Sequence, residues 1–276
     1  MSDVVERTEK YYDSADADNF YFRIWGGEDL HIGIYESPED TIRDASVRTV
    51  ERMAAKIKDR PAGSKLLDLG AGFGGSCRWL ARNLGLQCVA LNLSKVQNDR
   101  DRKMNADQGL ADKVDVVDGN FEQLPFGDAE FDLVWSQDSI LHSGDRRKVF
   151  EEANRVLKPG GEIVFTDPMQ KPDADQEALQ PVLNRIHLET MGSFEKYEAF
   201  AQDLGWELIE RDDLSPNLPR HYATVRAELD RRAAEIGDDI SQEYLGNMKR
   251  GLDHWVAAGE KGLLTWGILH FRKPSA

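Results

Sequence analysis

Cysteine is scarce in this sequence, which has only Cys77 and Cys88 among 276 residues. One lies in an expected helix and the other in an expected strand, which excludes a disulfide framework and a cysteine zinc site. We interpret both as small buried apolar side chains. No cluster of His, Cys and Asp has the spacing of metal ligands either, so we expect no metal ion.

Long hydrophobic runs are also missing. No apolar run approaches the roughly 20 residues that a membrane-spanning helix needs. The first 18 residues are polar and acidic and lack the apolar segment of a signal peptide, so we expect a cytoplasmic protein. Hydrophobic residues make up 40% of the chain and charged residues 31%, which is the composition of a globular protein.

Positive charge is outweighed by negative charge. The chain has 35 Lys and Arg against 50 Asp and Glu, and its formal net charge is −15 at pH 7. A field of this sign repels phosphate, which argues against binding to nucleic acid or to an anionic membrane. The charge fits an ordinary acidic enzyme, and it equally fits a protein that stays in solution in a salty cytoplasm.

The chain does contain a regular alternation of strand-like and helix-like segments from about residue 65 to residue 167. Short apolar runs predict strands at 65–69, 87–93, 113–117, 130–135 and 162–166, and helices are expected at 74–84, 94–107 and 146–157. Such alternation with short connections predicts an α/β fold, with parallel strands, right-handed crossovers and helices on both faces.

The remaining segments break this rhythm. We interpret residues 1–60 as an N-terminal arm or cap, and residues 61–276 as a core with cap insertions near 169–191 and 215–260. Within the core we expect a helix at 193–204, a strand near 207–214 and a final strand at 262–272. The arm and the insertions together are expected to cover a site.

A glycine-rich loop follows the first expected strand. It reads Asp68-x-Gly70-x-Gly72-x-Gly74, and it lies where a strand ends and a helix begins. Glycines at such a turn let the backbone approach a ligand closely. A structural turn or a dinucleotide site remains possible from the loop alone. Asp68 would repel a pyrophosphate, however, and it suits a cationic group such as the amino group of S-adenosylmethionine.

Polar residues also follow the later strands. Asn92 stands where a nucleotide-binding fold commonly places an acid against the ribose hydroxyls, and its amide can still hydrogen-bond a diol. Asn120 and Phe121 follow the third strand and offer a polar edge and an apolar face to a base. Gln137 belongs to a polar cluster, residues 136–142, after the fourth strand. A polar cluster at a strand end favours a functional role over a solvated loop.

Two sets of segments carry a resemblance. The first set, LLDLGAGFGGSCRWLA, VALNLS, GNFEQLPF, FDLVWSQDSILHS and RVLKPGGEIVFTDP, resembles class I methyltransferases that act on small molecules. The second set, YYDSADADNFYFRIWGGEDLHIGIYE, LSPNLPRHYATV and LLTWGILHFRK, resembles the sarcosine/dimethylglycine N-methyltransferases that make glycine betaine. That compatible solute is consistent with the acidic composition of a protein from a halophilic, salt-adapted organism.

The resemblance implies a Rossmann-like sheet of seven strands with the last one antiparallel, and a methyl donor, S-adenosylmethionine, that leaves as S-adenosylhomocysteine. It places Asp68, Gly70, Ala71 and Gly72 at the methionine and ribose end, Asn92 at the ribose, Asn120 and Phe121 at the adenine, and Gln137 near the sulfonium. It also implies that Tyr12, Tyr21 and Trp25 of the arm close over the donor and the acceptor.

The expected reaction is direct displacement at the sulfonium methyl by the amine of sarcosine or dimethylglycine. Our candidates are Arg23 and Arg220 for the acceptor carboxylate, Trp25, Tyr35 and Tyr222 for the methylated ammonium, His142 and His221 as proton acceptors, and Asp167 as a charge partner of the substrate cation. The partner is therefore a small amino acid, and both a monomer and a homodimer remain open.

Three alternatives stay open at this point. One is a methyltransferase for another small acceptor, such as glycine, phosphoethanolamine, a sterol or tocopherol-like ring, or a sugar. The second is a non-catalytic module that binds S-adenosylmethionine, which would not need the polar cluster at 136–142. The third is a dinucleotide oxidoreductase, against which the loop spacing and Asn92 both argue.

Overall fold

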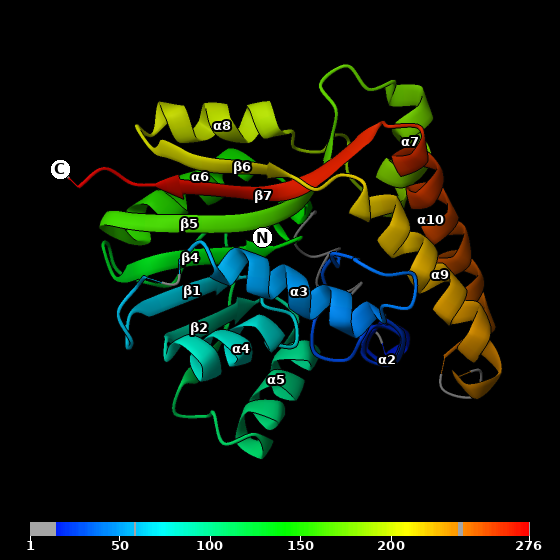
Figure 1. Cartoon of the computed structure of the whole chain (residues 1–276), viewed down its shortest axis with the longest axis horizontal. Helices are drawn as coiled ribbons and strands as arrows, with labels where there is room; N and C mark the ends of the chain where they lie inside the picture. The colour runs from blue at the N-terminus through cyan, green and yellow to red at the C-terminus, as the bar shows by residue number, and fades with distance from the viewer. Residues whose placement is uncertain (1–14, 58, 237–239, 276) are drawn as a thin grey trace.

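The computed structural model describes residues 15–57, 59–236 and 240–275. Seven strands of this part of the chain form one sheet in the order β3-β2-β1-β4-β5-β7-β6 (Figure 1). The strands are β1 (Lys65–Leu69), β2 (Gln87–Asn92), β3 (Val114–Asp118), β4 (Phe131–Gln137), β5 (Leu157–Gln170), β6 (Glu207–Asp213) and β7 (Leu264–Arg272). The expected α/β fold with a seven-stranded sheet is confirmed.

The strand directions follow the expected pattern. The neighbours among β1 to β5 run parallel, whereas β7 runs antiparallel to both β5 and β6. The chain therefore starts at the middle of the sheet with β1, moves to β3 at one edge, and then returns to β4 on the other side. The order of the strands reverses between β1 and β4, and ligands bind outside the carboxyl ends of the strands at such a point.

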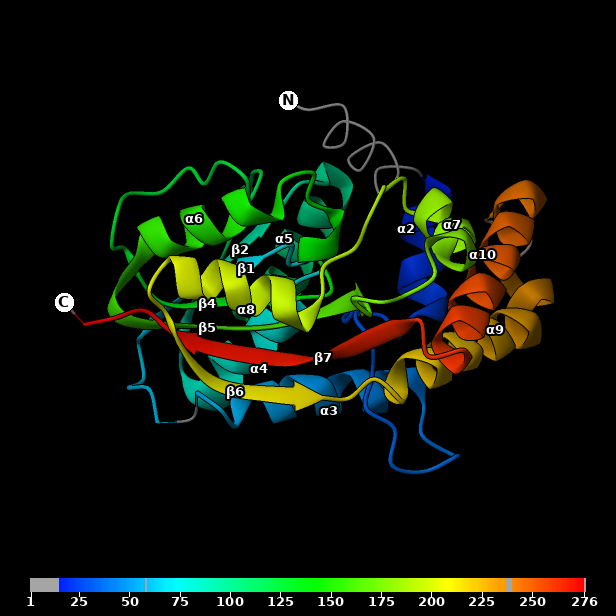
Figure 2. The same cartoon turned by 90° about the horizontal axis from the view of Figure 1, so that it is seen from above.

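Helices cover both faces of the sheet, as Figure 2 shows from above. On one face, α3 (Ile42–Ala54) and α4 (Gly75–Leu84) bury apolar side chains such as Met53 and Leu80 against β1 and β2. On the other face, α6 (Arg146–Val156) and α8 (Phe194–Asp203) bury Phe150 and Tyr197. Beside β3 lies α5 (Lys95–Asp107), for which Ser94 is the expected N-cap, accepting a hydrogen bond from the backbone of Gln97.

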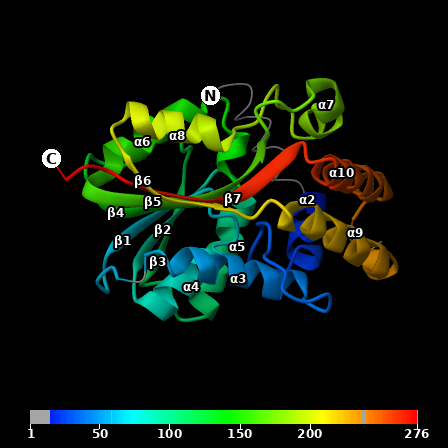
Figure 3. The same cartoon turned by 45° about the horizontal axis from the view of Figure 1, so that its top comes forward.

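A third apolar core lies among helices beyond the carboxyl ends of the parallel strands, and Figure 3 shows where these helices lie. Four helices from separate parts of the chain build it: α2 (Ala15–Ile24), α7 (Gln176–Arg185), α9 (Asn217–Ile236) and α10 (Gln242–Glu260). Phe20, Leu183, Leu229 and Leu252 are all buried in this core. The arm thus packs against segments that lie about 160–230 residues later in the sequence.

The largest difference in length from the sequence prediction is at β5. The expected 146–157 helix ends at Val156, and the chain passes directly into β5, which spans Leu157–Gln170 rather than 162–166. The strand reaches Gln170 because residues 162–170 pair in register with β7, and at its start Leu157 pairs with Phe131 of β4. In the region 215–260, α9 and α10 lie side by side. No helix among the described residues has the length and hydropathy to cross a membrane.

Candidate functional site

The glycine-rich loop between β1 and α4 depends on its glycines for steric reasons. Gly70, Gly72 and Gly74 have φ values of 79°, 58° and 73°, in the left-handed region. A Cβ atom at Gly70 would lie 2.5 Å from the side chain of Ser139, and one at Gly74 would lie 2.2 Å from Asp101. The loop is therefore packed against the segment after β4 and against α5, with no room for a side chain at Gly70 or Gly74.

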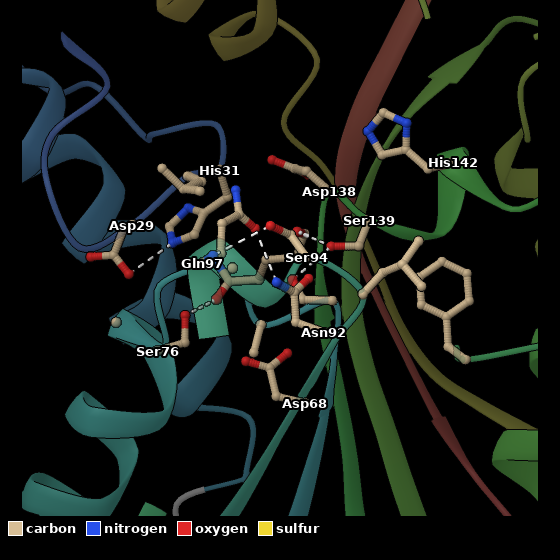
Figure 4. A pocket seen from close by; sticks show the side chains of 18 of the residues that line it. Asp29, His31, Asp68, Ser76, Asn92, Ser94, Gln97, Asp138, Ser139 and His142 are labelled. Atoms are coloured by element: carbon tan, nitrogen blue, oxygen red, sulfur yellow. Dashed lines mark hydrogen bonds and ion pairs between the residues drawn. The ribbon is translucent and has the colours of Figure 1, made fainter. Parts of the chain in front are cut away.

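This loop forms one wall of a cavity at the carboxyl ends of β1, β2, β3 and β4 (Figure 4). Residues 28–31 of the arm also line this cavity, and Leu30 and Asp29 lie close to Gly72 and Gly75. The predicted cofactor residues that line this cavity are Asp68, Gly70, Ala71, Gly72, Asn92, Asn120, Phe121, Gln137 and Tyr21. The sequence-based set thus converges on one place, with two exceptions. Trp25 lines a neighbouring cavity, and Tyr12 lies outside the described residues.

Asp68 is the buried acid of this cavity. Its side chain is only 3% exposed, and the Cys77 thiol lies 3.5 Å from Oδ2. Burial raises the pKa of Asp68 to about 7, because desolvation disfavours the charged carboxylate. A cation placed beside Asp68 would restore the charged form, so the site suits an ammonium group.

The ends of β2 and β4 supply amide groups. Nδ2 of Asn92 donates a 3.0 Å hydrogen bond to Oε1 of Gln97. Oε1 of Gln137 accepts hydrogen bonds from the Ser76 hydroxyl and from the Trp135 indole. The buried Nε2 atoms of Gln97 and Gln137 have no hydrogen-bond partner among the described residues. Both side chains line the cavity, and a polar ligand there would satisfy them.

The arm residues of this cavity that the sequence did not single out include an acid and a histidine in contact, Asp29 and His31. The Nε2 atom of His31 lies 3.4 Å from Oδ1 of Asp29. Although burial favours the neutral ring, the hydrogen bond and charge of Asp29 raise the pKa of His31 overall. Glu28 forms an ion pair of 2.8 Å with Arg78, which in turn binds the buried Asp101 at 2.6 Å. The arm is therefore tied to the helix that follows the glycine-rich loop.

Asp138 was also not predicted, and it has an unusual backbone. Its φ value of 53° is in the left-handed region, which costs energy for a residue with a side chain. Oδ2 accepts a 2.6 Å hydrogen bond from the Ile32 backbone, and Oδ1 accepts one of 2.8 Å from the Trp266 indole. Burial raises the pKa of Asp138. Residues with a strained backbone cluster at functional sites. The left-handed backbone of Asp138 therefore marks it as a site residue, but the sequence does not reveal this conformation.

A second cavity adjoins the first, and Tyr21, Leu30, Asp138 and His142 line both. The walls of the second cavity also include the aromatic residues Trp25, Tyr222 and Trp255, the aliphatic residues Ile32, Leu141, Ile186 and Leu252, and Pro168, Arg185, His187, Met248 and Gly251. The rings of Tyr222 and Trp255 are stacked 4.8 Å apart, and Trp25 meets Tyr222 edge-on at 6.0 Å. Aromatic faces of this kind attract cations.

The candidate proton acceptors lie in different places. His142 faces both cavities, and burial together with the charge of Arg146 lowers its pKa to about 4. His221 and Asp167 are fully buried and are not among the described residues that line either cavity. Burial lowers the pKa of His221 to about 3, and it raises the pKa of Asp167 to about 8.

The contacts of these two buried residues are structural. Asp167 accepts hydrogen bonds from the Tyr197 hydroxyl and from the Leu141 backbone. The Nδ1 atom of His221 accepts a 3.1 Å hydrogen bond from the Gly33 backbone, and the Tyr35 hydroxyl lies 3.0 Å from it. His221 thus holds the arm onto α9.

Arg220 has a similar place. Its guanidinium donates to the backbone carbonyls of Tyr35 and Ser37, at 3.1 and 2.6 Å, and lies over the Tyr35 ring. The backbone carbonyl of Arg23 accepts a hydrogen bond from Arg232. Arg23, Tyr35 and Arg220 are not among the described residues lining the two cavities. The LPRHY segment therefore anchors the arm through Arg220 and His221, and only its Tyr222 faces a cavity.

Known proteins match both the sequence and the fold. A methyltransferase domain family matches residues 67–165. Over 98% of both chains, the sequence is 56% identical to a sarcosine/dimethylglycine N-methyltransferase of Aphanothece halophytica. It is 55% identical to one of Halorhodospira halochloris, over 98% of this chain and 96% of the relative. The chain belongs to the sarcosine/dimethylglycine N-methyltransferase family.

A solved structure of this N-methyltransferase family shares the whole architecture. It is a protein from Galdieria sulphuraria described as a sarcosine dimethylglycine methyltransferase, with 44% identity and a TM-score of 0.91. The match covers 96% of this chain and 100% of the other, so it includes the capping helices as well as the sheet. The expectation that the chain is a methyltransferase is confirmed, and a dinucleotide oxidoreductase and a non-catalytic module are excluded.

Proposed function

We propose that this enzyme transfers methyl groups from S-adenosylmethionine to the amine nitrogen of sarcosine and dimethylglycine, which yields glycine betaine. The observation that carries the proposal is the aromatic cavity of Trp25, Tyr222 and Trp255, which adjoins the cavity of the glycine-rich loop. The donor and the acceptor amine then meet where the two cavities share Asp138 and His142. The names of the relatives support the choice of acceptor.

The first cavity would hold the donor, whose sulfonium supplies an already activated methyl group. Asp68 pairs with its ammonium group, and Gly70, Ala71 and Gly72 let the backbone approach the methionine and ribose portion. Asn92 binds the ribose diol and Asn120 the adenine edge, while Phe121 packs on the base. Gln137 uses its unsatisfied Nε2 to hold the methionine end near the sulfonium.

The second cavity would hold the acceptor. Methyl transfer places a positive charge on the acceptor nitrogen, and aromatic side chains that line a cavity stabilise such a charge by roughly 0.5–2 kcal/mol. The cage of Trp25, Tyr222 and Trp255 therefore favours the transition state and the methylated product over the neutral amine. Asp138 supplies the acidic partner of the ammonium at the junction of the cavities.

The proton balance is simple for the last methylation. Dimethylglycine loses its ammonium proton to solvent before the nitrogen can attack. The neutral tertiary amine that then gains a methyl group becomes a quaternary ammonium and has no further proton to lose. With a pKa of about 4, His142 is neutral at pH 7 and is too weak a base to keep a proton taken from an alkylammonium. We assign it a role as a neutral polar wall that orients the acceptor.

The proposal can be tested with purified enzyme and donor. Glycine, sarcosine, dimethylglycine or phosphoethanolamine is supplied as the acceptor, and the products are identified by mass. Sarcosine and dimethylglycine are expected to give glycine betaine, with little product from phosphoethanolamine. Turnover of phosphoethanolamine in preference to the amino acids would overturn it. Trp255→Leu is the matched variant, because it removes one wall of the aromatic cage and leaves the glycine-rich loop intact.

We also infer the setting in which the enzyme works. Its net charge of −15 and a product that is a compatible solute fit a salt-rich cytoplasm, in which screening removes most of the self-repulsion. Activity that rises or holds up to about 1 M salt would support this setting, whereas inactivation by moderate salt would contradict it.

We further infer how the chain is organised around the site. The arm, residues 1–60, and the segments 169–191 and 215–260 would cap a core of residues 61–276.

A further inference from the structure

The second cavity has an uneven distribution of charge. Among the described residues that line it, Arg185 is the one arginine or lysine and Asp138 is the one acid. Asp138 also lines the donor cavity, whereas Arg185 lines only the second cavity. The cavity is therefore acidic at its junction with the donor and basic at the end of α7.

The side chain of Arg185 lies in a space that a glycine leaves open on the neighbouring helix. It ends α7, and its side chain crosses α10 at Gly251. A Cβ atom at Gly251 would lie 2.6 Å from Nε and 3.0 Å from Cδ of Arg185. The guanidinium also contacts Met248, one turn earlier in α10. Any side chain at position 251 would therefore collide with Arg185 unless the arginine moved.

We propose that Arg185 binds the carboxylate of the acceptor and that Gly251 provides the space that its side chain needs. The inference rests on the proposed function, and it assigns which end of the cavity holds the carboxylate of the substrate and which end holds its amine. A small N-methylated amino acid carries a carboxylate and an amine one carbon apart. With the carboxylate at Arg185 and the amine toward Asp138, the nitrogen faces the donor.

The chemistry of the guanidinium suits this role. A planar guanidinium forms two parallel hydrogen bonds with a carboxylate, and Lys cannot reproduce that geometry. The earlier candidates Arg23 and Arg220 do not line the cavity in the described part of the chain, and Arg220 donates to backbone carbonyls of the arm. Arg185 therefore sets the requirement for a carboxylate in the acceptor.

The test compares dimethylglycine with 2-(dimethylamino)ethanol, which has the same amine and a hydroxyl in place of the carboxylate. Arg185→Ala is expected to lower kcat/KM for dimethylglycine by roughly 10- to 100-fold. The loss with the amino alcohol should be at least about ten times smaller, and Arg185→Lys should fall between the wild type and Arg185→Ala. Equal losses with both acceptors would overturn the proposal, because a purely structural role affects both alike.

Two glycines of α10 give a matched pair of variants. Gly251→Ala crowds Arg185, whereas at Gly246 a new Cβ would meet only the Arg250 guanidinium, at an ordinary 3.7 Å. We expect Gly251→Ala to raise the KM for dimethylglycine several-fold without changing the affinity for the donor, and Gly246→Ala to leave both unchanged. An unchanged KM in Gly251→Ala would refute the spatial part of the proposal.

Binding of glycine betaine to the enzyme with S-adenosylhomocysteine separates this inference from the proposed function. If the wild type binds betaine but turns over neither amino acid, the proposed function fails and the weaker binding by Arg185→Ala still tests the anchor. If the wild type is active and Arg185→Ala binds betaine as well as the wild type does, only the anchor fails. If the wild type neither binds nor reacts, both are overturned.

Discussion

The backbone N–H of Ile32 donates a 2.6 Å hydrogen bond to the carboxylate of Asp138, which joins the N-terminal arm to the end of β4. The second oxygen of this carboxylate binds the indole of Trp266 in β7. Three segments that lie far apart in the sequence thus meet at the side chain of Asp138. The backbone of Asp138 itself has a left-handed conformation. Because this side chain faces both cavities, the position of the arm and the geometry of the reaction depend on it.

Asp138→Asn should therefore weaken the attachment of the arm. Asn tolerates the left-handed conformation, but one carboxylate oxygen becomes an NH2 group that cannot accept a hydrogen bond from Ile32 or Trp266. We expect a roughly 10- to 100-fold lower kcat/KM and faster amide hydrogen exchange in residues 30–33. Asp112→Asn, in the exposed turn before β3, serves as a control. Exchange at wild-type rates in Asp138→Asn would contradict this role.

Asp68 should govern the pH dependence of donor binding. Without ligand its pKa is about 7, so the carboxylate must lose a proton before it can pair with an ammonium group below that pH. Affinity is expected to fall up to tenfold per pH unit below pH 7, and to fall again as the donor amino group deprotonates near pH 8. Calorimetry from pH 5.5 to 9 measures both limbs. Asp68→Asn should lose the acidic limb and bind much more weakly, and Asp68→Ala should bind hardly at all.

In the absence of ligand, the Asp68→Asn variant should have a higher free energy of unfolding than the wild type. The pKa of Asp68 is higher in the folded chain than in the unfolded chain, where it is about 3.9. Its contribution to stability is therefore fully present below about pH 4 and is lost as the pH rises through 7. At pH 8, Asp68→Asn is expected to raise the unfolding free energy by at least about 1 kcal/mol, or roughly 2–4 °C in Tm. A lower Tm would show that the charged carboxylate is well solvated.

Trp255→Leu tests the aromatic cage. Its ring stacks on Tyr222 at 4.8 Å, and its loss removes one face from the acceptor cavity. We expect kcat/KM for dimethylglycine to fall roughly 5- to 30-fold, corresponding to about 1–2 kcal/mol of cation–π stabilisation. Affinity for the donor should remain within about twofold, and Trp255→Phe should retain most of the activity. Equal activity of the Leu and Phe variants would mean that only apolar bulk matters.

His142→Asn tests whether the ring takes part in proton transfer. Because its pKa is about 4, His142 stays neutral from pH 6 to pH 9. The variant should have a lower rate but a pH profile of kcat with the same shape as the wild type. A limb near pH 6.5 that is present in the wild type and absent from the variant would instead identify His142 as a general base.

Much of the core could be predicted from the sequence, because its signals are local. Alternating apolar runs and helix caps gave the strand and helix positions, and Ser94 caps α5 as expected. The glycine-rich loop and the strand ends placed eight predicted cofactor residues in one cavity, where Tyr21 of the arm joins them. In parallel α/β sheets these residues must converge, since the carboxyl ends of the strands share one edge.

The acceptor side could not be predicted in the same way. Arg185 and Trp255 come from helices whose mutual packing decides which side chains face the cavity. Asp138 stood within a polar cluster, but its contact with Ile32 spans 106 residues and carries no local signal. The LPRHY motif indicated the correct family, yet Arg220 and His221 hold the arm, with His221 bonded to Gly33 across 188 residues.

Because Tyr21 and Leu30 of the arm line both cavities, the arm cannot move away from one cavity without opening the other. An exchange of spent donor for fresh donor that displaces the arm therefore also exposes the acceptor to solvent. Two successive methylations of one molecule should then be distributive rather than processive. Starting from sarcosine, free dimethylglycine is expected to accumulate before glycine betaine appears, and labelled dimethylglycine added during the reaction should mix with it completely.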